Sequence, residues 1–216
     1  MKVKVVENVL AYNKEHAQQN RKLFEKNGVF VINILSSPGA GKTSLIIETL
    51  KRLKDEYKVG VIEGDISSTH DADKIKQYTD SVVQINTGGS CHLNASMVKQ
   101  AMEKLDLEDL DIVFIENVGN LICPVNFDLG ENLMAVLASV NEGDDKPVKY
   151  PPVFIKSGLI LLNKMDMLKT SDFNLDFFME KVEQLNPQAE VIGFSCKTGE
   201  NLDNWIKWLK ENINHT

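Results

Sequence analysis

The chain has 216 residues, of which 43% are hydrophobic and 25% charged, and its formal net charge is −7. These values are typical of one soluble globular domain, and the acidic balance argues against nonspecific nucleic-acid binding, which needs basic surface. No apolar stretch approaches the roughly 18 residues of a membrane span, and the N-terminus lacks the apolar region of a signal peptide. We therefore expect a cytoplasmic protein that does not insert into a membrane.

The first predicted element is a polar-rich helix over residues 6–27. It ends at Asn27-Gly28, because a glycine commonly follows the last turn of a helix. We expect residues 1–28 to form a helical extension that packs on a core domain of residues 29–216. The apolar positions of this helix form a broken stripe of Val9, Tyr12, Ala17 and Leu23.

Short apolar runs alternate with helical patterns through the rest of the chain. We predict strands over 29–35, 59–63, 81–86, 110–116, 133–140, 158–163 and 190–194, and helices over 42–55, 70–78, 93–105, 172–185 and 201–212. This alternation indicates an α/β fold whose mostly parallel central sheet is covered by helices on both faces. Ligands of such sheets bind beyond the carboxyl ends of the strands. Residues 141–152 form the loosest predicted loop.

The segment Ser36-Ser37-Pro38-Gly39-Ala40-Gly41-Lys42-Thr43 lies between the first predicted strand and a helical pattern. Strand, glycine loop and helix are the context of a P-loop, whose backbone N–H groups and helix N-terminus bind phosphate oxygens. Lys42 is expected to reach the β- and γ-phosphates, and the Thr43 hydroxyl to ligate Mg²⁺. The pattern's first glycine is replaced by Ser36. The predicted nucleotide-binding residues here are Ser37, Pro38, Gly39, Ala40, Gly41, Lys42, Thr43 and Ser44.

Asn163-Lys164-Met165-Asp166 follows the sixth predicted strand. The Asp166 carboxylate can accept two hydrogen bonds from guanine, whereas adenine offers no such pair of donors. Asn163 is expected to join this loop to the P-loop, and the Lys164 side chain to lie over the base. After the last strand, Ser195-Cys196-Lys197 matches a second base-binding loop. These motifs favour GTP, and an ATP-dependent small-molecule kinase is the alternative.

Two carboxylates, Asp65 and Glu116, follow or end predicted strands. Such groups hold the Mg²⁺ water shell or position the attacking water, so we predict catalysis by Lys42, Asp65 and Glu116, and magnesium binding by Thr43, Asp65 and Glu116. A solvated acid after a strand is the alternative for either carboxylate. Glu116-Asn117-Val118-Gly119 resembles the DxxG switch of GTPases, in which the Gly119 N–H would sense the γ-phosphate. No glutamine has an obvious catalytic position, so we expect slow intrinsic hydrolysis.

The chain has three cysteines, which are too few for a disulfide framework and cannot all be paired because their number is odd. Cys91 and His92 follow the third predicted strand, and Cys123 follows the switch glycine. Thiolate and imidazole suit Zn²⁺ or Ni²⁺, and both segments leave the same rim of the sheet. Simple core cysteines and a structural histidine are the alternative. Cys196 is interpreted as part of the base-binding loop.

Taken together, SSPGAGKT, EGD, GGSCHLNA, ENVGNLICP, EGDDKPVKYPP and NKMD resemble the hydrogenase nickel-incorporation GTPases of the HypB family. The resemblance extends from about Asn20 onward. It implies the dimerising, SIMIBI-type P-loop GTPase fold and a nickel or zinc site of Cys91, His92 and Cys123 near a homodimer interface that GTP favours. It also implies delivery of Ni²⁺, with a HypA-type nickel chaperone, to the [NiFe]-hydrogenase large-subunit precursor.

The resemblance leaves two alternatives open, a urease-accessory GTPase and a nickel or zinc buffering protein whose nucleotide is structural. Some HypB proteins carry an N-terminal cysteine motif or histidine-rich tract, whereas residues 1–28 contain His16 and no cysteine. The sequence therefore favours metal transfer over metal storage. Lys146 and Lys149 are candidate cations for the nucleotide or a facing subunit, with a solvated loop as the alternative.

Overall fold

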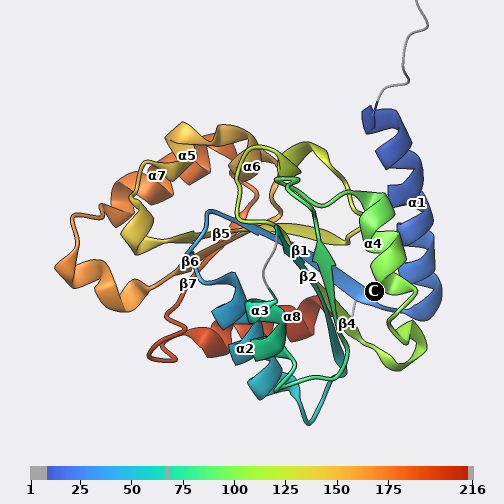
Figure 1. Cartoon of the computed structure of the whole chain (residues 1–216). Coiled ribbons are helices and arrows are strands. Elements are labelled where there is room, and N and C mark those ends of the chain that lie inside the picture. The colour runs from blue at the N-terminus through green and yellow to red at the C-terminus, as the bar shows by residue number, and fades with distance from the viewer. Residues whose placement is uncertain (1–8, 67–68, 214–216) are drawn as a thin grey trace, which may run out of the picture.

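A computed structural model describes residues 9–66 and 69–213 of the chain. A seven-stranded parallel sheet runs through its centre in the order β3-β2-β4-β1-β5-β6-β7 (Figure 1). Its strands are β1 (Phe30–Ser36), β2 (Val59–Asp65), β3 (Val82–Asn86), β4 (Ile112–Glu116), β5 (Leu133–Ser139), β6 (Leu159–Asn163) and β7 (Glu190–Gly193). Each predicted strand is present, and the predicted P-loop NTPase architecture is confirmed.

The helices cover both faces of the sheet (Figure 1). They are α1 (Val9–Asn27), α2 (Lys42–Leu53), α3 (His70–Ile75), α4 (Ala95–Met102), α5 (Lys146–Lys149), α6 (Pro151–Lys156), α7 (Leu175–Leu185) and α8 (Leu202–Ile213). Short 3₁₀ turns, η1 to η4, cover Leu107–Asp109, Pro124–Asn126, Val140–Glu142 and Met165–Thr170. Within the described ranges, none of the helices is both long enough and apolar enough to span a bilayer.

The prediction of a loop over 141–152 was wrong. Helix α5 lies inside this range, and α6 begins at Pro151. Pro147, Pro151 and Pro152 lie at the starts of these helices, where a missing N–H costs no intrahelical bond.

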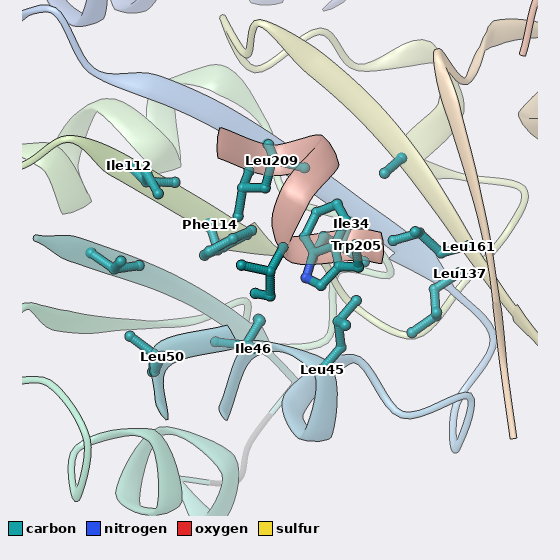
Figure 2. Close-up of a cluster of buried hydrophobic side chains, with 14 of the residues drawn as sticks. Ile34, Leu45, Ile46, Leu50, Ile112, Phe114, Leu137, Leu161, Trp205 and Leu209 are labelled. Carbon is teal, nitrogen blue, oxygen red and sulfur yellow. The ribbon is translucent and has the colours of Figure 1, made fainter. Parts of the chain in front are cut away.

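The buried residues of β1 alternate between two layers. Ile32 and Ile34 face α2 and α8, where Trp205 fills the centre of the largest apolar cluster (Figure 2). The Trp205 indole N–H donates to Thr49 Oγ1 at 2.8 Å, so the one polar atom of this large side chain is satisfied inside the core. Helix α8 is thereby fixed against the helix that follows the P-loop.

The opposite face of the sheet carries two separate apolar clusters. Val31 belongs to the cluster beneath α1 and α4, and Leu35 belongs to the cluster beneath α6 and α7. Between them on β1 lies Asn33, which is fully buried and hydrogen-bonded to Glu131 and Asn117. We call these three residues the polar seam.

The predicted apolar stripe of α1 is largely wrong, and residues 6–8 of the predicted helix lie outside the described residues. Val9, Tyr12 and Leu23 are 66%, 57% and 37% exposed. The buried face of this helix consists instead of Asn13, Ala17, Asn20 and Phe24.

Two asparagines attach α1 to backbone that is distant in sequence. Asn13 Oδ1 accepts from the Ala95 N–H at 2.8 Å, and Asn20 Nδ2 donates to the carbonyls of Ala95 at 2.8 Å and Leu129 at 2.9 Å. Gly130, at φ +94°, lets this backbone approach, since a Cβ there would lie 2.7 Å from a carbonyl oxygen of α1. The helix is therefore held by carboxamides as well as by apolar contact.

Candidate functional site

The P-loop connects β1 to α2 and depends on a glycine with left-handed backbone. Gly41 has φ +106°, and a Cβ at this position would collide with the Asn163 carboxamide. Lys42 is 9% exposed, and its ammonium donates to Ser36 Oγ at 3.0 Å. The serine that replaces the pattern's first glycine thus fixes the position of the Lys42 ammonium beside the loop.

The 163–166 motif is joined to the P-loop as predicted. Asn163 Nδ2 donates to the Ala40 carbonyl at 2.9 Å, and Asn163 Oδ1 accepts from the Cys196 N–H at 3.1 Å. The Lys164 ammonium donates to the Gly39 carbonyl at 2.7 Å. One buried carboxamide therefore fixes three loops with respect to one another.

The Asp166 carboxylate is oriented by the loop of residues 195–197, which was predicted to bind the base. Ser195 is fully buried, and its hydroxyl donates to Asp166 Oδ1 at 2.6 Å. Burial raises the pKa of Cys196 to about 12, so this thiol is neutral in the base loop at neutral pH. Lys197 is exposed at the rim.

A cavity of about 430 Å³ lies beyond the carboxyl ends of β1, β2 and β4. Lys42, Thr43, Asp65, Glu116 and Gly119 all line it, so the structure brings together the residues predicted for catalysis and magnesium. Thr43 Oγ1 donates to Glu116 Oε1 at 2.8 Å. A Cβ on Gly119 would lie 3.0 Å from Pro38, which places the switch glycine directly against the P-loop.

Glu63 is a cavity residue that the sequence analysis missed. It lies on β2 directly beside Glu116 of β4, and the two side chains are only 2% and 4% exposed. Burial raises the pKa of Glu63 to about 8 and that of Glu116 to about 7, and the Lys42 charge opposes both shifts. The available signal was a glutamate inside the apolar run VGVIEGD. Burying an acid in a strand that is covered on both faces is unfavourable, so such a residue indicates a functional role.

The oxygens of this cavity are chemically suited to a magnesium ion, although its acids do not form a preformed cluster of three within the described residues. Within the described part of the chain, Oε2 of Glu63 and Oε2 of Glu116 are buried without a hydrogen-bond partner. A set made only of carboxylate and hydroxyl oxygens suits Mg²⁺, and a cation there would offset the cost of burying two acids. Thr43, Asp65 and Glu116 therefore remain suitable ligands, and Glu63 joins them.

Two further cations lie near the nucleotide cavity. Lys74 of α3 lines it together with Asp71. Lys146 Nζ lies 3.3 Å from Ser37 Oγ of the P-loop and 3.6 Å from Glu142. Lys149 is exposed and paired with its neighbour Asp145.

The Cys91 thiol lies beside the thiol of Cys123, the last residue of the segment 116–123, which we call the switch loop. The Cys123 thiol interacts with the Cys91 thiol and is the main cause of the raised pKa of Cys91. His92 Nδ1 lies 3.7 Å from Cys91 Sγ, and the imidazole packs on Phe127 with ring centroids 3.9 Å apart. Burial lowers the pKa of His92, which favours the neutral form that binds metals.

The structure gathers the two thiols but does not complete the predicted three-residue set. Among residues 9–66 and 69–213, no group of three histidines, cysteines or acids is arranged to hold a metal ion. The sequence analysis placed Cys91, His92 and Cys123 at one rim, and this much is observed. The packing of His92 on Phe127 depends on a ring 35 positions away, which spacing alone did not indicate.

The family described as CobW/HypB/UreG, nucleotide-binding domain, matches residues 30–193. The hydrogenase maturation factor HypB of Rhizobium leguminosarum bv. viciae is 45% identical over 208 residues, which cover 96% of this chain and 70% of the relative. The hydrogenase/urease maturation factor HypB of Helicobacter pylori is 39% identical over 97% of this chain and 87% of its own length.

Solved structures give the same result. The crystal structure of HypB from Helicobacter pylori in complex with nickel superimposes with a TM-score of 0.90 and 38% identity, covering 94% of this chain and 96% of that one. The signal recognition particle receptor FtsY from Elizabethkingia anophelis has a TM-score of 0.55 at 16% identity, over 86% of this chain and 68% of that one. The second likeness shows a shared fold only.

Proposed function

The chain belongs to the CobW/HypB/UreG family, among its hydrogenase maturation factors HypB, and we propose that it is a GTP-hydrolysing switch that delivers nickel to the [NiFe]-hydrogenase large-subunit precursor. The observation that carries this proposal is the course of the switch loop. This loop begins at Glu116 in the nucleotide cavity and ends at Cys123, whose thiol meets Cys91. A nucleotide and a soft metal would therefore contact opposite ends of one eight-residue segment.

Guanine selection would depend on Asp166. Its carboxylate, oriented by Ser195, would accept the two guanine donors, while Lys164 would lie along the base. Backbone N–H groups from Gly39 to Ser44 would hold the phosphates together with the Lys42 ammonium.

The acids of the cavity would serve hydrolysis. Thr43, Asp65 and Glu116 would bind Mg²⁺, which supplies positive charge to the phosphates when bound. Asp65 and Glu116 would orient the attacking water, and Gly119 would sense the γ-phosphate. We expect slow intrinsic turnover, well below the enzyme median of about 10 s⁻¹.

Nickel would be the cargo, bound by the Cys91 and Cys123 thiolates and by neutral His92, with Zn²⁺ competing for the same donors. Because one chain does not complete a ligand set within its described residues, a second copy would complete it. We propose that GTP favours this homodimer and that a HypA-type chaperone supplies the metal. A reducing cytoplasm would keep both cysteines as thiols.

Urease maturation is a second candidate client, because the Helicobacter pylori relative is named a hydrogenase/urease maturation factor. Expression of this protein in strains that lack the maturation factor separates the two clients. Restored hydrogenase activity without restored urease activity supports hydrogenase as the client. If Lys42→Ala still restores hydrogenase, the nucleotide is merely structural and the protein is a metal buffer.

The direct test is a Ni²⁺ titration of wild type and Cys123→Ala, each loaded with GDP or a non-hydrolysable GTP analogue, with dimerisation followed by light scattering. We expect nickel binding to need Cys123 and to differ between the nucleotides. Linkage then requires nickel to change nucleotide affinity by the same factor. Unchanged nickel binding by Cys123→Ala would remove the metal site and leave the GTPase proposal intact.

A further inference from the structure

We propose that Asn117 is the positioning residue through which the nucleotide cavity and the Cys91–Leu93 segment sense each other. The inference rests on the function proposed above and names the residue that would carry its coupling. Asn117 is 1% exposed, follows Glu116 and lines the nucleotide cavity beside Val118 and Gly119. It is therefore a buried side chain within the turn that we propose senses the γ-phosphate.

The side-chain oxygen of Asn117 holds two segments at once. Asn117 Oδ1 accepts from the Val118 N–H at 3.0 Å and from the Leu93 N–H at 3.1 Å. Val118 belongs to the switch turn, whereas Leu93 comes directly after the Cys91-His92 pair. A displacement of either N–H must stretch one bond or carry the other segment with it.

Leu93 also contacts the other strand end of the cavity. Its side chain is fully buried against Gly64, since a Cβ at Gly64 would lie 2.8 Å from Leu93 Cδ1. Gly64 stands between Glu63 and Asp65 at the end of β2. Leu93 is therefore held between the two strand ends that carry the cavity's carboxylates.

A second asparagine joins the same two segments closer to the thiols. Asn120 Nδ2 donates to the Cys91 carbonyl at 3.3 Å, and Asn120 Oδ1 accepts from the Ile122 N–H at 2.8 Å. The switch loop thus contacts the 91–93 segment at a buried point and at a half-buried one. Because there are two points of contact, both the distance between the two segments and their relative orientation are fixed.

The polar seam holds the Asn117 carboxamide from behind. Asn117 Nδ2 donates to Asn33 Oδ1 at 3.2 Å, and Asn33 Nδ2 donates to Glu131 Oε1 at 3.0 Å. Asn33 belongs to β1, the central strand of the sheet. Because the carboxamide cannot rotate freely, motion of the switch turn reaches Leu93 and is not absorbed by the Asn117 side chain.

The test compares the ratio of Ni²⁺ dissociation constants in the GDP and GTP-analogue states. Allosteric couplings typically amount to about 5–150-fold, and we expect Asn117→Ala to bring the wild-type ratio to within about twofold of one. The alkylation rates of Cys91 and Cys123 by iodoacetamide, measured without metal, should likewise lose their dependence on nucleotide. A purely structural role would shift both affinities without changing their ratio.

Asn186→Ala is the matched control. Its carboxamide also binds backbone, donating to the carbonyls of Phe154 at 3.0 Å and Ser157 at 2.9 Å, but it lies at the end of α7. This variant should keep the wild-type ratio. If Asn117→Ala does not fold, Asn117→Leu, which has the same branched shape but no acceptor oxygen for the Leu93 and Val118 N–H groups, takes its place with the same expectation.

The outcomes are distinct. A ratio near one in Asn117→Ala and a wild-type ratio in Asn186→Ala support the inference. A full wild-type ratio in Asn117→Ala, or in Asn117→Leu where that variant replaces it, overturns this inference alone. Nucleotide-independent nickel binding in wild type overturns both the coupling proposed above and the role of Asn117.

Discussion

Replacing Glu63 with glutamine should flatten the dependence of the free energy of unfolding on pH. Burial beside Glu116 raises the pKa of Glu63 from 4.5 to about 8. Between these values the folded state keeps a proton that the unfolded state has released, so stability falls as pH rises through this window and is level above it. Each pH step of one within the window costs about 1.4 kcal/mol, so a rise from about pH 5.5 to about pH 7.5 costs about 3 kcal/mol through Glu63.

The assay is urea unfolding followed by circular dichroism at those two pH values, without nucleotide or magnesium. Wild type should lose about 3 kcal/mol more than Glu63→Gln between them, a large part of a typical total of about 5–15 kcal/mol. The matched control is Glu183→Gln, on the exposed side of α7, which should behave as wild type. Equal pH slopes in wild type and Glu63→Gln would refute the reasoning. Mg²⁺ with GDP should reduce the wild-type slope, because a cation favours the ionised acids.

Three further substitutions test other parts of the structure. Gly41→Ala forces a side chain into left-handed backbone and onto Asn163, so fluorescent GDP should bind at least about tenfold more weakly; unchanged affinity would show that the loop adapts. Asp166→Asn should reduce guanine preference by about 1–3 kcal/mol in competition with other nucleotides, and an unchanged preference would remove Asp166 from base selection. Asn20→Ala should lower stability by about 1–3 kcal/mol in thermal melts, since two buried carbonyls lose their donor. A melting temperature equal to wild type would contradict that account of α1.

The strands and the nucleotide loops were predictable because their signals are local. Each strand is a short apolar run, and the P-loop is punctuated by Gly39 and Gly41 between a strand and a helix. The contact between Asn163 and the P-loop also followed from the sequence, since both motifs leave the carboxyl edge of one parallel sheet. The place of each strand and loop therefore follows from residues that are adjacent in the sequence.

The features that were missed depend on partners distant in sequence. Asn13 and Asn20 of α1 pack through carbonyls 115 and 75 residues away, so no periodic pattern of apolar residues marks that face. The bond from Asn117 to Leu93 spans 24 residues and is visible only once two strands are neighbours. Glu63 resembles an ordinary strand-end acid until its register partner on β4 proves to be another glutamate.

The positions of the tryptophans determine which part of this protein intrinsic fluorescence monitors. Trp205 and Trp208, the two tryptophans of the chain, both lie on α8, with ring centroids 5.8 Å apart. Trp205 is bonded to Thr49 of α2, so intrinsic emission follows the helix behind the P-loop. Cys91 and Cys123 do not lie on α2 or α8 but in loops at the carboxyl edge of the sheet. An indole introduced at Phe127, against His92, would give the metal-binding end its own optical signal.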